Sequence, residues 1–395
     1  MKRVMIFFAL MLSACATPTP MRAPTRAPTI APTIAPTRVD TPLPTIQPTN
    51  QPTLPSSPNV EIFAKGLDTP WAIDFAPDGR AFFTERLGAI RVIKDGKLQA
   101  EPWMKIAVSE VSEAGLLGLV LDPQFARNRF VYVAYTTREG GRIVNRLVRL
   151  REENDKGAFD KILIDNVSAA NNHDGGRVKF GPDGKVYWTM GDAQNTSLAQ
   201  DLGSLNGKIL RLNSDGTIPN DNPFPNSYVY SYGHRNPQGL AWQPGTNRLY
   251  AAEHGPSGGG ASCCRDELNL IEPGKNYGWS LITGDQTREG LVAPVIHSGN
   301  DYTWAPSGIA FATRGAWAGS LLITGLRGEA LYRVSLDKND PRKATSIERL
   351  FERKYGRLRD VIEGPDGALY ILTSNADGRG NVGADGDVIL RVVFK

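Results

Sequence analysis

Cysteine is scarce in this sequence, and charge is not concentrated in any stretch. Three cysteines occur in 395 residues: Cys15 and the adjacent pair Cys263 and Cys264. A zinc-finger site is disfavoured because the pair has no third and fourth soft ligand at finger spacing. The formal net charge is only +4, and basic residues do not cluster along the chain. The composition therefore gives no indication of a nucleic-acid partner.

The adjacent cysteines leave two interpretations open. In an oxidising compartment Cys263 and Cys264 can form a vicinal disulfide. The alternative is a pair of free thiols in a loop, and the sequence favours neither.

Long helical periodicity is also scarce. Glycine is abundant, with 41 residues, while β-branched and aromatic residues recur in short runs. Short apolar runs bounded by turn residues indicate strands, so we expect an all-β fold. From residue 59 to residue 395 the composition is typical of one large globular domain, or at most two.

The first 58 residues are expected to lie outside that domain. Residues 1–15 combine Met-Lys-Arg, an apolar run at 4–12 and small residues before Cys15, which is the pattern of a signal peptide. The segment Leu-Ser-Ala-Cys at 12–15 resembles the bacterial lipobox. This resemblance implies cleavage before Cys15 and lipidation of its thiol; the alternative is ordinary secretion, with Cys15 removed or spare.

Residues 16–58 are dominated by Pro and Thr, and such a segment cannot build a packed core. We expect an extended, disordered stalk of polyproline II character. Together, the two N-terminal segments predict an extracytoplasmic protein on the periplasmic or cell-surface side. Its contact with the membrane would be through the lipid anchor only.

Within the domain one unit recurs: a polar segment, a short apolar strand, a Pro/Asp/Gly turn, a second apolar strand and another polar segment. The unit appears six times, at 69–86, 113–136, 171–192, 234–256, 304–328 and 357–375. A period of this length is typical of a propeller blade, so we predict a six-bladed β-propeller with four-stranded blades. Further strand-like runs at 89–94, 146–150, 208–212 and 330–335 are expected to be outer strands. The run 386–394 is expected to close the ring beside the first blade, and the alternative is a stack of sandwich domains.

The third unit carries the first candidate for chemistry. Its strands flank the turn signal Gly-Pro-Asp-Gly at 181–184, with His173 just before the first strand and Asp192 just after the second. An antiparallel hairpin brings those two ends together. A carboxylate beside one ring nitrogen fixes the histidine tautomer and leaves the other nitrogen free as a base. The alternative is a polar hairpin end with an exposed histidine.

In a propeller the corresponding ends of all six units face one central opening. We therefore expect one pocket to be ringed by Glu113, His173, Asp192, Arg235, Asn236, His254, Gly255, Pro256, Arg327, Arg357 and Arg359. A single rim arginine is usually a solvated charge, but several guanidinium groups at one mouth suit a polyanionic ligand.

Several stretches resemble the pyrroloquinoline quinone (PQQ)-dependent soluble glucose dehydrogenase and aldose sugar dehydrogenase family. They lie at 113–125, 172–192, 232–242, 253–256, 266–279 and 357–373, and the segment Gly-His-Arg-Asn-Pro-Gln-Gly-Leu within the third of them is the most specific. The resemblance covers essentially the whole domain. It implies a six-bladed propeller that holds PQQ in its central mouth.

Carried over by position, the resemblance makes His173 the general base and Asp192 its orienting carboxylate. It places Arg235 and Asn236 beside the quinone, and it implies that Arg357 and Arg359 bind the PQQ carboxylates. The carbonyls at Gly255 and Pro256 would hold a catalytic Ca²⁺, and Glu267 and Tyr277 a second, structural one. Glu113 stands where some members have Gln in contact with the cofactor, and Arg327 stands where the glucose enzymes have Lys.

The resemblance implies PQQ- and Ca²⁺-dependent oxidation of an aldose at C1 to a lactone. His173 would take the hydroxyl proton, hydride would pass to PQQ, and electrons would leave to an external acceptor. Tyr302 and Trp304 are interpreted as a sugar-stacking wall or, alternatively, as packing residues of the fifth blade. Two other functions stay open: a Ca²⁺-dependent lactonase or esterase, and a non-catalytic binding propeller.

Overall fold

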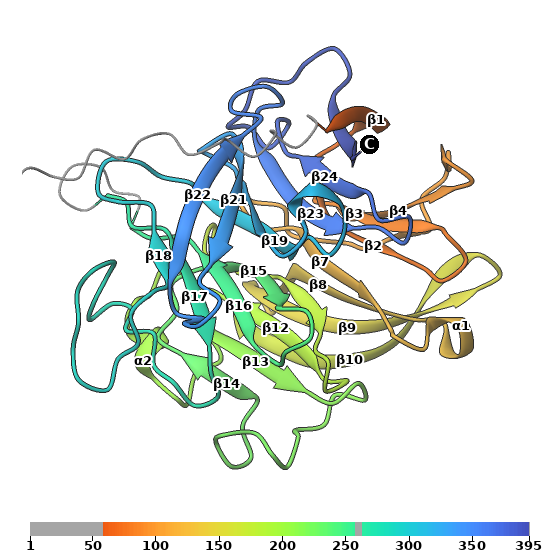
Figure 1. Ribbon diagram of the computed structural model, residues 1–395. Helices are drawn as coiled ribbons and strands as arrows, with labels where there is room; N and C mark the ends of the chain where they lie inside the picture. The colour runs from red at the N-terminus through yellow and green to blue at the C-terminus, as the bar shows by residue number, and fades with distance from the viewer. Residues whose placement is uncertain (1–57, 257–262, 395) are drawn as a thin grey trace, which may run out of the picture. The chain divides into compact units, whose positions relative to one another are not determined.

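The computed structural model describes residues 58–256 and 263–394, and within them six antiparallel sheets surround a common axis (Figure 1). The expected signal peptide, the lipidated Cys15 and all but the last residue of the stalk lie outside the described residues, so these remain predictions. In the described part of the chain no helix is both long and apolar enough to cross a membrane.

The first three blades each contain four strands in sequence order, counted outward from the axis. Blade 1 contains β2 (Pro70–Phe75), β3 (Ala81–Glu85), β4 (Ala89–Lys94) and β5 (Lys97–Leu98), with β6 (Met104–Lys105) also paired to β4. Blade 2 contains β7 (Leu116–Leu121), β8 (Phe130–Glu139), β9 (Arg142–Glu153) and β10 (Lys156–Ser168). Blade 3 contains β11 (Val178–Phe180), β12 (Val186–Met190), β13 (Lys208–Leu212) and β14 (Val229–Tyr232).

The other three blades follow the same plan, except at the end of the ring. Blade 4 contains β15 (Pro237–Trp242), β16 (Leu249–Glu253), β17 (Glu267–Ile271) and β18 (Ile296–His297). Blade 5 contains β19 (Pro306–Phe311), β20 (Leu321–Gly325), β21 (Ala330–Leu336) and β22 (Ala344–Leu350). Blade 6 contains β23 (Leu358–Glu363), β24 (Leu369–Thr373), β25 (Asp387–Val393) and, from the other end of the domain, β1 (Asn59–Leu67).

Helices in the described ranges are limited to short turns between strands. They are α1 (Phe125–Asn128), α2 (Ser197–Gln200) and the 3₁₀ turn η2 (Gly315–Trp317). This bears out the expectation of an all-β fold drawn from the scarcity of helical periodicity.

The ring closes differently from the prediction. The C-terminal strand β25 is the third strand of blade 6, and the N-terminal β1 pairs with it antiparallel, with Asn59 opposite Val393. Residues 386–394 therefore do not pair with the first blade. Instead, the two ends of the domain are hydrogen-bonded to each other, so that blade 6 is built from both termini.

The hydrophobic core is divided among the six junctions between neighbouring blades. One cluster joins blades 1 and 2 through Trp71, Phe82 and Leu119, and a comparable cluster lies at each of the other five junctions. The middle strands are buried on both faces, which explains their short, continuous apolar runs. Full burial of one such large side chain stabilises the fold by about 1.5–3 kcal/mol.

The predicted repeat is confirmed in register as well as in number. In each blade the predicted turn connects the innermost strand to the second strand, as at 181–185 between β11 and β12. The loops that precede the inner strands and follow the second strands therefore meet at the opposite end of the ring. The functional candidates lie in these loops.

Candidate functional site

A polar cavity of ≈ 440 Å³ lies where these loops meet. Its lining residues are Glu113, Asn172, His173, Arg235, His254, Thr303, Ala305, Leu326, Arg327, Arg357 and Arg379. They come from blades 2 to 6, so segments more than 250 residues apart share one wall. Six of the residues predicted to ring a pocket, namely Glu113, His173, Arg235, His254, Arg327 and Arg357, are among them.

His173 and Asp192 meet as the hairpin argument predicted. His173 Nδ1 lies 2.7 Å from Asp192 Oδ1, and the carboxylate is fully buried. The close approach depends on Gly191, because a Cβ there would come within 2.0 Å of the His173 carbonyl oxygen. An ionised Asp192 makes Nδ1 the donor, which leaves Nε2 as an acceptor at the cavity wall.

Asp192 is itself held by two further donors. Its Oδ2 accepts a hydrogen bond of 2.8 Å from the indole N–H of Trp279, and its Oδ1 also accepts one from the backbone N–H of Gln194. Trp279 in turn lies under the guanidinium of Arg235, 5.4 Å from the ring centroid to Cζ. The base, its carboxylate and a cation are therefore joined through one indole ring.

Arg235 and Asn236 lie side by side, but only the first lines the cavity. The Arg235 side chain donates to the His254 carbonyl, and burial lowers its pKa, which nearby carboxylates such as Asp192 oppose. Asn236 is fully buried and accepts a hydrogen bond from the Gly175 N–H at 3.0 Å. Asn236 thus supports the His173 loop from beneath.

Glu113 is an anion on a wall that is otherwise rich in arginine. Burial opposes its charge, but neighbouring groups outweigh burial and hold its pKa at about 2; Arg379, hydrogen-bonded to Oε1 at 2.8 Å, is one of them. His254 contributes in the same direction only when it is protonated. Because burial lowers the pKa of His254 to about 4, at neutral pH Arg379 is the cation that keeps Glu113 ionised.

Arg357 and Arg359 occupy different depths. Arg357 lines the cavity and donates twice to Asp377 Oδ2, at 3.0 and 2.8 Å. Arg359 is two residues further along the inner strand and donates instead to Gln238 Oε1 at 3.0 Å. Burial lowers the pKa of Arg359 to about 9. The predicted pair is thus split between the cavity wall and the polar axis of the ring.

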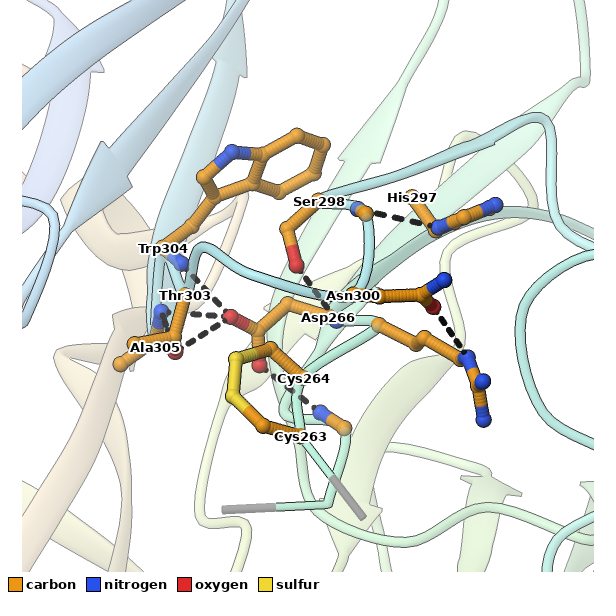
Figure 2. The surroundings of a disulfide bond; sticks show 12 residues. Cys263, Cys264, Asp266, His297, Ser298, Asn300, Thr303, Trp304 and Ala305 are labelled. Atoms are coloured by element: carbon orange, nitrogen blue, oxygen red, sulfur yellow. Dashed lines mark hydrogen bonds between the residues drawn. A yellow bond between two sulfur atoms is a disulfide. The ribbon is translucent and has the colours of Figure 1, made fainter. Parts of the chain in front are cut away.

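The Gly255 turn is tied to the neighbouring blade by a carboxylate that the sequence analysis did not single out. Asp266 Oδ1 accepts from the Gly255 N–H at 2.8 Å, and Oδ2 accepts from Thr303 Oγ1 at 2.7 Å. The same Oδ2 accepts the backbone N–H groups of Trp304 and Ala305 (Figure 2). Asp266 therefore joins the loop that leaves blade 4 to the loop that enters blade 5. Pro256 follows this turn directly.

Cys263 and Cys264 are joined as a disulfide beside Asp266 (Figure 2). Of the two interpretations drawn from the sequence, the structure has the vicinal disulfide. Cys264 is buried, and its carbonyl oxygen lies so close to Gly255 that a Cβ there would approach it to 2.1 Å. The bond thus lies within the turn that packs on Gly255.

Replacing both cysteines with Ala is expected to lower the free energy of unfolding by less than about 1 kcal/mol. A disulfide that closes a 15-residue loop contributes about 3 kcal/mol, whereas adjacent residues close almost no loop in the unfolded chain. Urea unfolding of the variant, and of the wild type with and without a phosphine reductant, measures this. A loss of several kcal/mol in both comparisons would show that the bond stabilises the whole domain.

Glu267 and Tyr277 lie in blade 4, away from the cavity wall. Burial and the neighbouring Glu253 raise the pKa of Glu267 to about 8. The Tyr277 hydroxyl donates to the Leu270 carbonyl at 2.6 Å and accepts the Glu272 N–H, so it is already engaged. No group of three His, Cys, Asp or Glu side chains suited to a metal occurs within 58–256 and 263–394.

Of the two aromatic residues proposed as a sugar wall, neither lines the cavity. Trp304 is buried in the core between blades 4 and 5, with its ring 5.3 Å from that of Tyr332. The Tyr302 hydroxyl is hydrogen-bonded to Tyr332 and to the Gly328 carbonyl. The wall is formed instead by their neighbours Thr303 and Ala305. The packing interpretation therefore applies to Trp304.

Three residues that the sequence analysis missed complete the site: Arg379, Trp279 and Asp266. Arg379 lies in the glycine-rich segment after β24, which was interpreted only as a loop. Trp279 ends a stretch that carried the family resemblance, which was the one available signal. Asp266 had no signal, because its role depends on contacts with a loop almost 40 residues away.

The cavity wall has an excess of positive charge. Among its described residues Glu113 is the sole carboxylate against four arginines, and it is paired with Arg379. Propeller hydrolases that hold Ca²⁺ through side chains need several acidic or amide groups around the metal. This wall suits an anionic ligand better.

Comparison with known proteins agrees with this geometry. Residues 67–390 match the glucose / sorbosone dehydrogenase family. The chain is 34% identical to the aldose sugar dehydrogenase YliI of Escherichia coli, over 82% of this chain and 92% of that protein. It is 28% identical to quinoprotein glucose dehydrogenase B of Acinetobacter calcoaceticus, over 82% and 86%. The PQQ-bound aldose sugar dehydrogenase of Streptomyces coelicolor is similar with a TM-score of 0.76 at 36% identity, over 86% and 99%.

Proposed function

The chain belongs to the glucose / sorbosone dehydrogenase family, and from this premise we propose that it oxidises aldose sugars at C1 to lactones with PQQ and Ca²⁺. Electrons would pass on to an external acceptor. The observation that carries the proposal is the His173–Asp192 pair at the wall of an arginine-rich cavity.

The chemistry of the cavity fits PQQ, whose carboxylates need cationic partners. Arg235, Arg327 and Arg357 line it, and Arg327 is exposed and makes no hydrogen bond or ion pair within the described segments. His254 Nε2 is buried and also lacks a partner there, so it is available to a bound group. Ca²⁺ would depend on the carbonyls of Gly255 and Pro256 and on oxygens of the cofactor.

When bound, PQQ would supply a two-electron acceptor for the hydride of C1, and Ca²⁺ a Lewis acid. The protein supplies the proton acceptor: His173 Nε2 takes the proton of the C1 hydroxyl, while Asp192 holds Nδ1–H and stabilises the imidazolium that forms. Arg235 provides a fixed positive charge, and its stacking on Trp279 limits its motion.

Reconstitution tests this proposal. Purified protein freed of metal and cofactor is incubated with PQQ and Ca²⁺, and aldoses are supplied with an artificial dye acceptor. Dye reduction should require both additions and yield the aldonolactone. Hydrolysis of lactones or aryl esters with Ca²⁺ alone would favour the lactonase alternative, and tight PQQ binding without turnover would favour a binding propeller.

Arg357→Leu is expected to weaken PQQ binding by at least about 10-fold, because a hydrogen bond to a charged group contributes about 1.5–3 kcal/mol. It should also lower stability, since Asp377 loses a buried partner and keeps only the more distant Arg359 at 3.8 Å. Titration of the apo-protein with PQQ and thermal unfolding measure the two effects.

The double variant Arg357→Leu/Asp377→Asn separates them. Its neutral amide removes the buried charge, so stability should recover while PQQ affinity stays low. Wild-type affinity in the double variant would mean that Arg357 supports Asp377 and does not hold the cofactor.

A further inference from the structure

Four polar residues form a bridge across the cavity mouth, which we call the Glu113 bridge: Ser112, Glu113, Asn172 and Arg379. Arg379 Nη1 donates to Glu113 Oε1 at 2.8 Å. Arg379 Nη2 donates to Ser112 Oγ at 2.8 Å and to Asn172 Oδ1 at 3.0 Å. Arg379 belongs to blade 6, whereas its partners precede the inner strands of blades 2 and 3, so the bridge passes over the entrance of blade 1.

The blade 6 end of the bridge is anchored. Asp377 Oδ1 accepts the backbone N–H of Arg379 at 2.9 Å, and Asp377 Oδ2 is held by Arg357. Gly380 packs directly on this arginine, because a Cβ there would lie 2.7 Å from Arg357 Cδ. Arg379 is therefore held by its own loop in the position from which it reaches Glu113.

The other end of the bridge reaches the proposed base. Glu113 Oε2 accepts the backbone N–H of His173 at 3.3 Å and lies 3.5 Å from Asn236 Nδ2. His173 has φ of 67°, in the left-handed region where a residue with a Cβ costs of order 1–3 kcal/mol. The carboxylate therefore helps to hold a backbone conformation that the histidine would not adopt freely.

We propose that Arg379 is a positioning residue for His173, acting through Glu113. It fixes the carboxylate that holds the His173 backbone, and its charge offsets that of Glu113 beside the imidazole. The inference rests on the proposed function in one respect, the role of His173 as the base.

The charges around His173 give the proposal a measurable sign. Asp192 and Asp174 face it from its own blade, Glu113 from blade 2, Arg235 and His254 from blade 4, and Arg379 from blade 6. Removal of Arg379 leaves the Glu113 carboxylate uncompensated, which favours the imidazolium. Removal of Glu113 leaves the guanidinium uncompensated, which favours the neutral ring.

A purely structural role would predict something else. The Arg379 side chain is 46% exposed, and an ion pair of that kind contributes only about 0–1 kcal/mol to global stability. The variants should therefore remain folded, with melting temperatures close to that of the wild type. The effect is expected at one imidazole and not in the fold as a whole.

The test compares Arg379→Gln, Glu113→Gln and the double variant. NMR titration of the apo-protein follows the His173 ring, which is assigned by its loss in His173→Gln. Arg379→Gln should raise the pKa of His173 by about half a unit or more, Glu113→Gln should lower it, and the double variant should return it toward the wild-type value. Arg379→Lys, which keeps the charge, should recover most of the shift.

In the reconstituted enzyme the acid limb of kcat/KM should move with these shifts, to higher pH for Arg379→Gln. Arg333→Gln is the matched control, since it removes an exposed arginine–glutamate pair on blade 5, and neither titration nor profile should change. Single variants that stay folded and shift the pKa in the same direction, or not at all, would overturn the proposal. A wild type inactive on aldoses would refute the proposed function alone, because the NMR titration needs no turnover.

Discussion

His173→Gln is expected to lower kcat by about 10²–10⁴-fold, the range that a positioned general base contributes. The Gln side chain is close in size but cannot accept a proton near neutral pH. The effect should fall on kcat and not on binding, because the cationic wall that suits PQQ is formed by other residues. Steady-state kinetics of the reconstituted variant, with PQQ affinity measured separately on the apo-protein, distinguish the two.

His297→Gln is a useful control for this experiment, because His297 is the outer-strand histidine of blade 4 and does not line the cavity. Its kcat should equal that of the wild type. Near-normal turnover in His173→Gln would remove His173 from the role of base, whatever the control shows.

Asp192→Asn is expected to reduce kcat on the same scale, about 10²–10⁴-fold, although the residue does not line the cavity. Oδ1 receives the Gln194 N–H and faces His173 Nδ1, whereas Oδ2 receives the Trp279 N–H. An amide must place its nitrogen against one of these donors. If the nitrogen faces His173, it donates to Nδ1 and forces the proton onto Nε2, where it blocks the base. In either orientation the negative charge that stabilises the imidazolium is lost.

A buried unsatisfied group costs about 1–3 kcal/mol, so the Asp192→Asn protein should be checked by thermal unfolding before its kinetics are interpreted. Trp279→Phe is the matched control, because it removes the donor to Oδ2 and leaves the carboxylate charge in place. Its loss of kcat should be much smaller. Equal losses in the two variants would mean that the indole, and not the charge, is what the base requires.

The parts of the site that could be predicted from sequence are those that a single hairpin determines. The turn at 181–184 fixes the register of β11 against β12, and that register alone brings His173 to Asp192. The recurrence of such hairpins then predicts which loops meet at one end of a propeller. No contact between distant blades was needed for either step.

The parts that could not be predicted depend on depth, facing or contact between blades. Arg357 and Arg359 share one side of a strand, but two residues advance the chain by roughly 6–7 Å, so the second lies deeper along the axis. Trp304 is aromatic and adjacent to lining residues, but only packing decides that its ring faces Tyr332. Arg379 and Glu113 are 266 residues apart, and only closure of the ring determines that they meet.

The pairing of β1 with β25 makes the last-synthesised strand the partner of almost the first. During synthesis and export, residues 59–67 must wait with an unsatisfied strand edge until nearly the entire chain has emerged. Such an edge can pair with another molecule, and long-range pairing is slow because the loop-closure entropy comes first. A protein built this way has reason to depend on holding factors during translocation, and premature termination near its C-terminus would leave two sticky edges in place of one closed ring.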